Sequence, residues 1–233
     1  MAAPVIHYTF DVDGTNSGSL GTANNLTIPS DFSIDDTNQL IGTKCLKAIG
    51  PSTASSATTI TTFPAWTTPD NFTISFWGKC SAWTSTNHRL IDFTINGFLV
   101  VIAFQTNQSM LFYNNANNAL SNIIIPNTFD NAYHHFVLTF SGTTADLYID
   151  NVLYTPQVSF PFSFSQQSIT ALAIGSSLGA DPTYNGYIDD FRIYDYALPA
   201  AQINSLYIVG LLINAPIIHY PLDVDGTNNG SLG

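Results

Sequence analysis

Hydrophobic and polar positions alternate over short stretches of this chain, which predicts β-strands rather than helices. The clearest stretch is FTISFWGKC, residues 72–80, where Phe72, Ile74 and Phe76 share one side and Trp77 takes the other. Large residues on both sides predict a strand that is buried on two faces. Turn residues separate the predicted strands, which are residues 5–12, 44–50, 72–80, 89–95, 97–105, 109–114, 133–142, 145–155, 169–176 and 186–198.

Two dipeptides predict tight turns between neighbouring strands. Asn96-Gly97 separates two apolar segments, and Asn-Gly is the strongest short signal for a β-hairpin. Asp150-Asn151 stands in the middle of a second pair of strand-like segments. Both pairs of segments are therefore expected to be antiparallel neighbours.

The sequence predicts a single short helix, residues 198–207, LPAAQINSLY. Pro199 suits the first helical position, and Ile203, Leu206 and Tyr207 fall on one face. Many short strands and one short C-terminal helix predict an all-β protein, a two-sheet antiparallel jelly-roll sandwich. Parallel α/β folds are excluded, because no helices are predicted between the strands.

The chain carries a second copy of its own beginning. Residues 3–21, APVIHYTFDVDGTNSGSLG, match residues 215–233, APIIHYPLDVDGTNNGSLG, at 15 of 19 positions. The interpretation is one domain, residues 1–214, followed by the start of a second repeat copy at 215–233. Because an unpaired strand edge seeks a partner, self-association through the 215–233 strand is expected.

Composition excludes several classes of protein. Hydrophobic residues make up 45% of the chain and charged residues 9%, which is typical of a packed globular protein. The net charge is −11 with only five basic residues, so a nucleic-acid partner is excluded. No apolar run is long enough to cross a bilayer, and no membrane insertion is expected. The N-terminus has no signal-peptide pattern.

Four segments resemble a known family. Residues 7–21, 71–79, 133–154 and 172–207 are similar, in order, to the motifs of the laminin-G-like jelly-roll family within the concanavalin A-like lectin/glucanase superfamily. The resemblance implies two curved antiparallel sheets whose first and last strands lie side by side. Some members of the superfamily are glucanases, whereas others are lectins.

The carboxylates argue against an enzyme. Retaining and inverting glycosidases need two carboxyl groups that flank the scissile bond. This chain has no glutamate, and its 16 acidic residues are all aspartate. Asp11 and Asp13 have the i, i+2 spacing that places both on one strand face, so an aspartate-based glycosidase stays an alternative. No Gly-x-Ser-x-Gly nucleophile motif is present. The prediction is a protein that is not an enzyme.

Calcium is the one cofactor predicted. The resemblance implies a structural Ca²⁺ near the first and last strands, where Asp11 or Asp13 could approach Asp189 or Asp190. Ca²⁺ prefers carboxylate and carbonyl oxygens. The alternative is that Asp13 makes a turn, while Asp189 and Asp190 pair with Arg192 or bind local backbone.

Three turn-rich stretches combine an aromatic residue with Asn, Asp or His, as sugar sites do. They are residues 83–89, 112–118 and 180–186. The alternative is that these stretches only make turns and cover sheet edges. The residues predicted to contact carbohydrate are Trp83, Asn87, His88, Tyr113, Asn114, Asn115, Tyr184 and Asn185.

The resulting hypothesis is a non-catalytic binding module that recognises carbohydrate within a tandem-repeat surface or virion protein. Its partner would be a glycan or a cell-surface protein, and its location the extracellular surface or a virion. The alternatives are an architectural protein of a capsid or filament and, further off, a glycan-cleaving enzyme. Cys45 and Cys80 permit one disulfide, but two buried thiols are the preferred interpretation.

Overall fold

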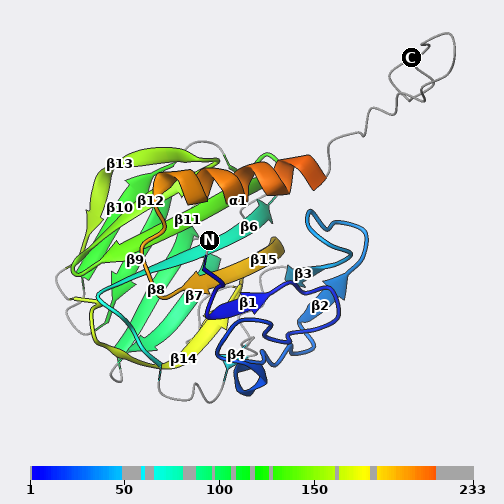
Figure 1. The fold of residues 1–233 in the computed structure, drawn as a ribbon, viewed down its shortest axis with the longest axis horizontal. Helices are drawn as coiled ribbons and strands as arrows, with labels where there is room; N and C mark the ends of the chain where they lie inside the picture. The colour runs from blue at the N-terminus through cyan, green and yellow to red at the C-terminus, as the bar shows by residue number, and fades with distance from the viewer. Residues whose placement is uncertain are drawn as a thin grey trace, which may run out of the picture.

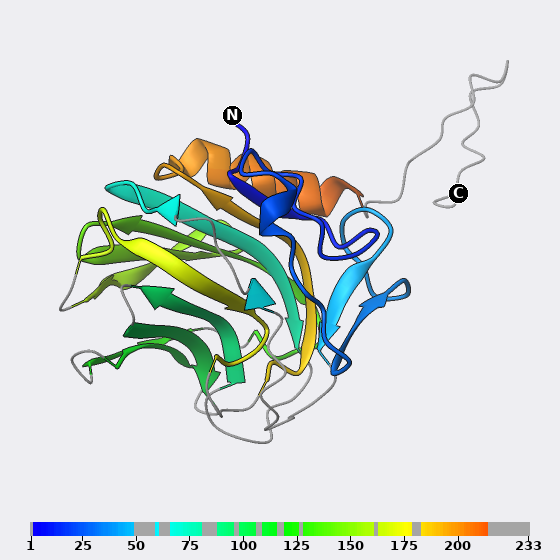
Figure 2. The ribbon, with the colours of Figure 1, turned by 90° about the horizontal axis from the view of Figure 1, so that it is seen from below.

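The computed structural model describes residues 2–48, 59–60, 66–80, 88–95, 98–105, 109–115, 119–125, 128–160, 163–178 and 183–213. Within these residues two antiparallel sheets pack together, and a helix covers the outer face of one sheet (Figure 1). The view from below shows that the sheets are curved and that the helix lies outside the sandwich (Figure 2). The predicted all-β jelly-roll sandwich is confirmed.

The larger sheet has eight strands in the order β13-β12-β11-β6-β15-β3-β2, with β1 also paired to β15. These strands are β1 (Ile6–Tyr8), β2 (Phe32–Asp35), β3 (Cys45–Ala48), β6 (Asn71–Cys80), β11 (Tyr133–Ser141), β12 (Thr144–Ile149), β13 (Val152–Ser159) and β15 (Gly186–Tyr194).

The smaller sheet has seven strands in the order β10-β9-β8-β7-β14-β4, with β5 also paired to β14. These strands are β4 (Thr59–Ile60), β5 (Trp66–Thr67), β7 (His88–Ile95), β8 (Phe98–Gln105), β9 (Ser109–Asn114), β10 (Ala119–Ile124) and β14 (Ser168–Ile174). A 3-10 helix, Thr22–Asn24, and the helix α1, Ala200–Ile213, complete the described elements.

Alternate positions of the strands build the core between the sheets, as the two-residue period of a strand requires. In β6, Phe72, Ile74 and Phe76 are at most 1% exposed and belong to this core. The ring of Phe76 stacks on that of Phe136, with centroids 5.2 Å apart. Burying one such side chain stabilises the fold by roughly 1.5–3 kcal/mol, so aromatic pairs dominate the packing.

The opposite face of β6 is buried as well, because α1 lies on it. Thr73 accepts a hydrogen bond from the Leu198 N–H at 2.9 Å, which fixes the start of α1 against β6. Further along, Tyr207 stacks on Trp77 with centroids 5.8 Å apart, and Gly210 contacts the same indole. The prediction of a strand buried on both faces is confirmed.

Most predicted elements are found, with differences at their ends. The Asp150-Asn151 turn joins β12 to β13, and both residues have positive φ, 51° and 65°. β7 and β8 pair as predicted, while Asn96 and Gly97 lie outside the described residues. α1 extends to Ile213, beyond the predicted end. Strands β2, β4, β5 and β10 were not predicted.

β1 pairs with β15, which confirms that the first and last strands lie side by side. The second copy, 215–233, lies outside the described residues, so its pairing stays a prediction. Cys45 and Cys80 are both buried, and neither forms a disulfide. Among the described helices, none has the length and apolar character needed to span a membrane.

Candidate ligand-binding site

Two of the three stretches predicted to bind sugar meet at one end of the sandwich. The His88 Nδ1 lies 3.1 Å from the carbonyl oxygen of Thr183, and Arg89 bridges to Thr183. The described ends of 83–89 and 180–186 are therefore neighbours. Trp83 and Asn87 lie outside the described residues, so their predicted contact with sugar stays a prediction.

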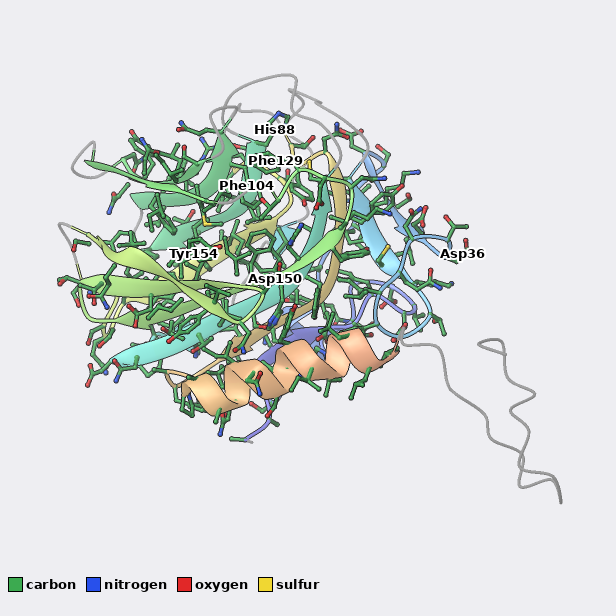
Figure 3. The ribbon with its side chains drawn as sticks, turned by 90° about the horizontal axis from the view of Figure 1, so that it is seen from above. Asp36, His88, Phe104, Phe129, Asp150 and Tyr154 are labelled. Carbon is green, nitrogen blue, oxygen red and sulfur yellow. The ribbon has the colours of Figure 1, made fainter. Side chains whose placement is uncertain are left out.

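His88 and Tyr184 are interior residues. Their exposed fractions are 0% and 1%, and His88 lies opposite Phe104 in the β7–β8 ladder. Figure 3 shows His88, Phe104 and Phe129 close together at this end of the sandwich. Both side chains are buried in the described structure, and their predicted contact with a sugar stays a prediction. Asn185, which is half-buried, stays a candidate.

The third stretch lies at the opposite end of the seven-stranded sheet. Tyr113 and Asn114 end β9, level with Val101 and Val100, whereas His88 is level with Phe104. Asn114 is buried, and the exposed Asn115 accepts a hydrogen bond from the Leu99 N–H at 2.8 Å. The described parts of the three stretches therefore do not converge on one site. Contact of Tyr113, Asn114 and Asn115 with sugar stays a prediction.

Of the predicted calcium ligands, Asp11 and Asp189 both bind the backbone of one loop, residues 40–44. The Asp189 Oδ2 accepts hydrogen bonds from the Leu40 and Ile41 N–H groups at 2.8 and 2.9 Å. The Asp11 Oδ1 accepts from the Lys44 N–H at 3.3 Å. Burial raises the pKa of Asp189 to about 7. Backbone N–H groups thus donate to an oxygen of each carboxylate.

Asp190 and Asp13 have other roles. The Asp190 Oδ1 lies 2.8 Å from both the Arg192 Nη2 and the His7 Nε2. Asp13 is exposed and accepts a hydrogen bond from the Thr15 N–H at 2.7 Å. These contacts match the alternative reading, in which the carboxylates bind backbone and Arg192.

Calcium binding itself stays a prediction. No group of three or more His, Cys or Asp side chains within the described residues is arranged to hold a metal ion. The Asp189 Oδ1 and the Gln39 Oε1 are buried without a hydrogen-bond partner there, and such oxygens suit a cation or a water.

A row of alternating lysines and tyrosines crosses four strands on the outer face of the eight-stranded sheet. Lys47 on β3 lies opposite Tyr187 on β15, Tyr187 opposite Lys79 on β6, and Lys79 opposite Tyr133 on β11. We call these four residues the lysine–tyrosine row. The Lys47 and Lys79 ammonium groups lie 5.8 and 5.4 Å from the centroid of the Tyr187 ring. Cation–π attraction therefore orders the row.

The row is open to solvent and flanked by hydrogen-bonding groups. All four of its residues are half-buried, and the Lys47 side chain is 38% exposed. Lys79 donates a hydrogen bond to the Asn38 Oδ1 at 3.2 Å, and the Lys47 Nζ lies 3.8 Å from the Asp35 Oδ2. Aromatic rings, ammonium groups and an amide thus share one surface.

The row also holds two of the few positive charges of the chain. Of the five basic residues, Arg89 pairs with Asp92 and Arg192 pairs with Asp190. In a chain with a net charge of −11, these two lysines bring positive charge to either side of the central strand β15. The sequence alone did not reveal this site, because its members are far apart along the chain.

A second surface feature lies beside the first repeat copy. A hollow of about 270 Å³ is lined by Asp13, Gly14, Thr15, Asn25, Leu26 and Ile28. Its polar groups could bind hydroxyls, but it contains no aromatic ring on which a sugar could stack.

The adjacent histidines of β11 have opposite electrostatics. The His134 Nδ1 lies 2.6 Å from Asp150, labelled in Figure 3, and the Nε2 lies 3.1 Å from Asp130. The hydrogen bond to Asp150 raises the pKa of His134. Burial lowers the pKa of His135 to about 4, and this neutral ring stacks on Trp77. Both rings serve structure: His134 ties β11 to the β12–β13 turn.

Replacing His134 with glutamine is expected to destabilise the domain by about 1 kcal/mol at pH 5.5 and by less at pH 8.5. Because the folded-state pKa lies above the unfolded value, the stabilisation is complete below the unfolded pKa and is lost as pH rises through the folded one. Urea unfolding of both proteins at the two pH values measures the difference. An equal loss of stability at both pH values would show that the charge of His134 does not stabilise the fold.

Comparison with protein families identifies the class of protein. A family model described as the concanavalin A-like lectin/glucanases superfamily matches residues 52–204, more than half of the chain. The chain belongs to the concanavalin A-like lectin/glucanase superfamily, and the resemblance seen in the sequence is confirmed. A search of curated proteins finds no match.

Solved structures share the fold at low identity. Domain 4 of AbnA, an extracellular arabinanase from Geobacillus stearothermophilus, is 19% identical with a TM-score of 0.63, and the match covers 88% of this chain and 98% of that one. The botulinum neurotoxin serotype G binding domain is 16% identical with a TM-score of 0.60, covering 88% and 51%. A Trypanosoma rangeli sialidase is 12% identical with a TM-score of 0.57, covering 92% and 34%. This chain thus spans about half of the toxin domain.

Proposed function

We propose that this protein is a non-catalytic carbohydrate-binding module whose ligand lies on the lysine–tyrosine row. The row itself is the observation that carries the proposal. Sugars present both apolar C–H faces, which pack on aromatic rings, and hydroxyls, which need hydrogen-bond partners. Tyr133 and Tyr187 supply the rings, and Lys47, Lys79 and Asn38 supply the polar groups.

The similarity to the arabinanase domain supports this proposal. That domain was solved in complex with arabinotriose, and this chain matches nearly all of it. The fold therefore accommodates a sugar site in a unit of the same size. Since the sialidase match covers only a third of that enzyme, it lends little support to catalysis.

The non-catalytic part of the proposal rests on the carboxylates. Glutamate is absent, and the two pairs of aspartates that could act together are divided among separate contacts. Asp11 and Asp189 bind backbone N–H groups, while Asp190 pairs with Arg192. A glycosidase needs two carboxyl groups facing one bond. Among the described residues, the Asp35 carboxylate beside the row lies against the Lys47 ammonium group, 3.8 Å away.

A glycan array followed by titration calorimetry tests the site. Replacing Tyr187 with alanine is expected to weaken the best array ligand at least about tenfold, because the central ring of the row is removed. Replacing Lys79 with alanine should also weaken binding, whereas replacing Tyr113 with alanine should leave it unchanged. Tyr113 is the matched control, a half-buried tyrosine at the far end of the other sheet.

The outcomes separate the two sites. If binding is lost in Tyr113→Ala and retained in Tyr187→Ala, the sugar lies at the stretch first predicted from the sequence. If no glycan binds at all, the carbohydrate proposal fails. Turnover of a polysaccharide that disappears in Asp11→Asn or Asp189→Asn would overturn the non-catalytic part.

An architectural role within a tandem-repeat surface or virion protein is the second candidate. Two observations favour it: the 19-residue repeat and the apolar end of α1. Five apolar side chains at this end of the helix are 41–64% exposed: Ile208, Val209, Leu211, Leu212 and Ile213. Exposed apolar patches mark sites of protein contact, and such a protein would act at an extracellular surface.

A further inference from the structure

The first repeat copy forms a strand and a covering loop at one edge of β15. β1 lies in a slot beside β15, where Ile6, His7 and Tyr8 are level with Ile193, Arg192 and Phe191. The chain then turns and covers the other edge of β1. There the Ser17 N–H donates to the His7 carbonyl at 2.9 Å, and the Leu20 N–H donates to the Val5 carbonyl at 3.0 Å. We call β1 and residues 9–21 the edge unit.

Specific side chains hold the edge unit together. The Asn16 Oδ1 accepts hydrogen bonds from the His7 N–H at 2.8 Å and from the Gly18 N–H at 2.9 Å. The Asn16 Nδ2 donates to the Gly21 carbonyl at 3.0 Å, so this one buried amide closes the loop. Gly18 must be glycine, because a Cβ there would overlap the Val5 carbonyl oxygen.

Contacts with the rest of the domain are equally specific. The His7 Nε2 lies 2.8 Å from the Asp190 Oδ1, and the Tyr8 hydroxyl donates to the Asn24 carbonyl at 2.7 Å. The Tyr8 ring is fully buried and stacks on Phe191, with centroids 6.1 Å apart. The slot on β15 therefore recognises both the backbone and the side chains of β1.

The edge-unit residues whose side chains make these contacts recur in the second copy. The residues corresponding to His7, Tyr8, Gly14, Asn16, Gly18 and Leu20 are His219, Tyr220, Gly226, Asn228, Gly230 and Leu232. Two of the four differences exchange one apolar residue for another. Pro221 replaces Thr9, which follows the last residue of β1, so the paired stretch keeps its backbone N–H groups.

The second copy cannot reach the slot of its own domain. α1 runs alongside β6 in the same direction, from Leu198 at Thr73 to Gly210 at Trp77 (Figure 1). The slot begins level with Ile193, which pairs with Ile74, and β1 also runs in the direction of β6.

To reach the slot, the chain leaving Ile213 would have to return about 14 Å along the strand direction and cross two strand spacings of about 5 Å each. It would also have to pass from the helix layer to the sheet and then reverse its direction. Five Cα–Cα steps to Ile218 span at most about 18 Å when fully extended, which leaves no length for that reversal.

We propose that residues 215–233 form a second edge unit, which occupies the β1 slot on β15 in another copy of this domain. The donor segment follows α1 in the chain, whereas the acceptor slot lies on β15, so the proposed contact is heterologous and joins copies head to tail. The proposal is independent of sugar binding, because the slot and the lysine–tyrosine row share no residue.

Full-length chains test the exchange. Size-exclusion chromatography with light scattering should show association that grows with protein concentration and with time. Gly230→Ala should reduce the associated fraction roughly tenfold or more, because the methyl group disrupts the donor unit. It should leave the melting temperature of the monomer unchanged. Asn229→Ser is the matched control: it makes the second copy more like the first and should preserve association.

A second measurement locates the contact. His7 is level with Arg192, so a His219→Cys chain mixed with a chain carrying Arg192→Cys and Gly18→Ala should form a mixed disulfide dimer. Gly18→Ala loosens the β1 of the acceptor and should increase the yield. Chains that stay monomeric without a mixed disulfide, or association unaffected by Gly230→Ala, would overturn the proposal.

Discussion

Replacing Arg89 with methionine is expected to lower the free energy of unfolding by about 3–5 kcal/mol, the usual cost of leaving one partner of a buried ion pair alone. The Arg89 Nη1 lies 3.2 Å from the Asp92 Oδ1, and the two side chains are 8% and 0% exposed. Burial raises the pKa of Asp92 to about 6 even with Arg89 beside it. Without the arginine, the folded variant must bury Asp92 either as a charged carboxylate without its ion-pair partner or in the protonated form.

Urea unfolding at pH 8 and pH 5 measures this effect. The deficit should be smaller at pH 5, because the carboxyl group of Asp92 is then protonated in the folded variant. A double variant, Arg89→Met with Asp92→Asn, should recover most of the stability, since an asparagine oxygen can still accept the Leu178 N–H that Asp92 accepts at 2.9 Å. If the double variant is as unstable as the single one, the loss of stability comes from the lost packing of the arginine side chain and not from the charge of Asp92.

Replacing Gly210 with valine is expected to destabilise the domain by about 2–3 kcal/mol, through overpacking of α1 on the sheet. A Cβ at this position would overlap the Trp77 indole. Trp77 cannot yield, because it is 2% exposed and its ring stacks on His135 at 4.8 Å. The helix must therefore lift away from β6.

Thermal unfolding followed by tryptophan fluorescence measures the loss. Ser205→Val is the matched control, since it adds the same side chain to an exposed position of the same helix and should cost about 0.5 kcal/mol or less. Equal losses in the two variants would mean that the helix propensity of valine, and not the contact with Trp77, sets the effect.

The strands could be predicted from the sequence because the order of apolar and polar residues within each strand shows which of its faces are buried. In residues 72–80, Phe72, Ile74 and Phe76 on one side and Trp77 on the other predicted that both faces of β6 are buried. The end of α1 could not be predicted in this way. Ile208 to Ile213 have no polar face, and their exposed side chains break the period that marks a helix packed against a core.

The candidate site was beyond local reasoning. Lys47, Lys79, Tyr133 and Tyr187 come together only through the order and register of four strands. Conversely, an aromatic residue within a turn-rich stretch indicated a surface site at Tyr184, but the Tyr184 side chain is buried. A turn-rich sequence shows where the chain bends, and it does not show on which side of the bend a ring lies.

The loop that covers the outer edge of β1 also limits how fast copies of the domain can join. As long as residues 16–20 cover this strand, no chain can enter the slot, however concentrated the protein is. Joining copies would require this edge to open first, and opening breaks the contacts of Asn16 and Tyr8 together. The rate of assembly would then follow the rate of local unfolding, with the steep dependence on temperature that unfolding shows. Freshly folded protein and protein stored for days could differ in size while being identical in sequence.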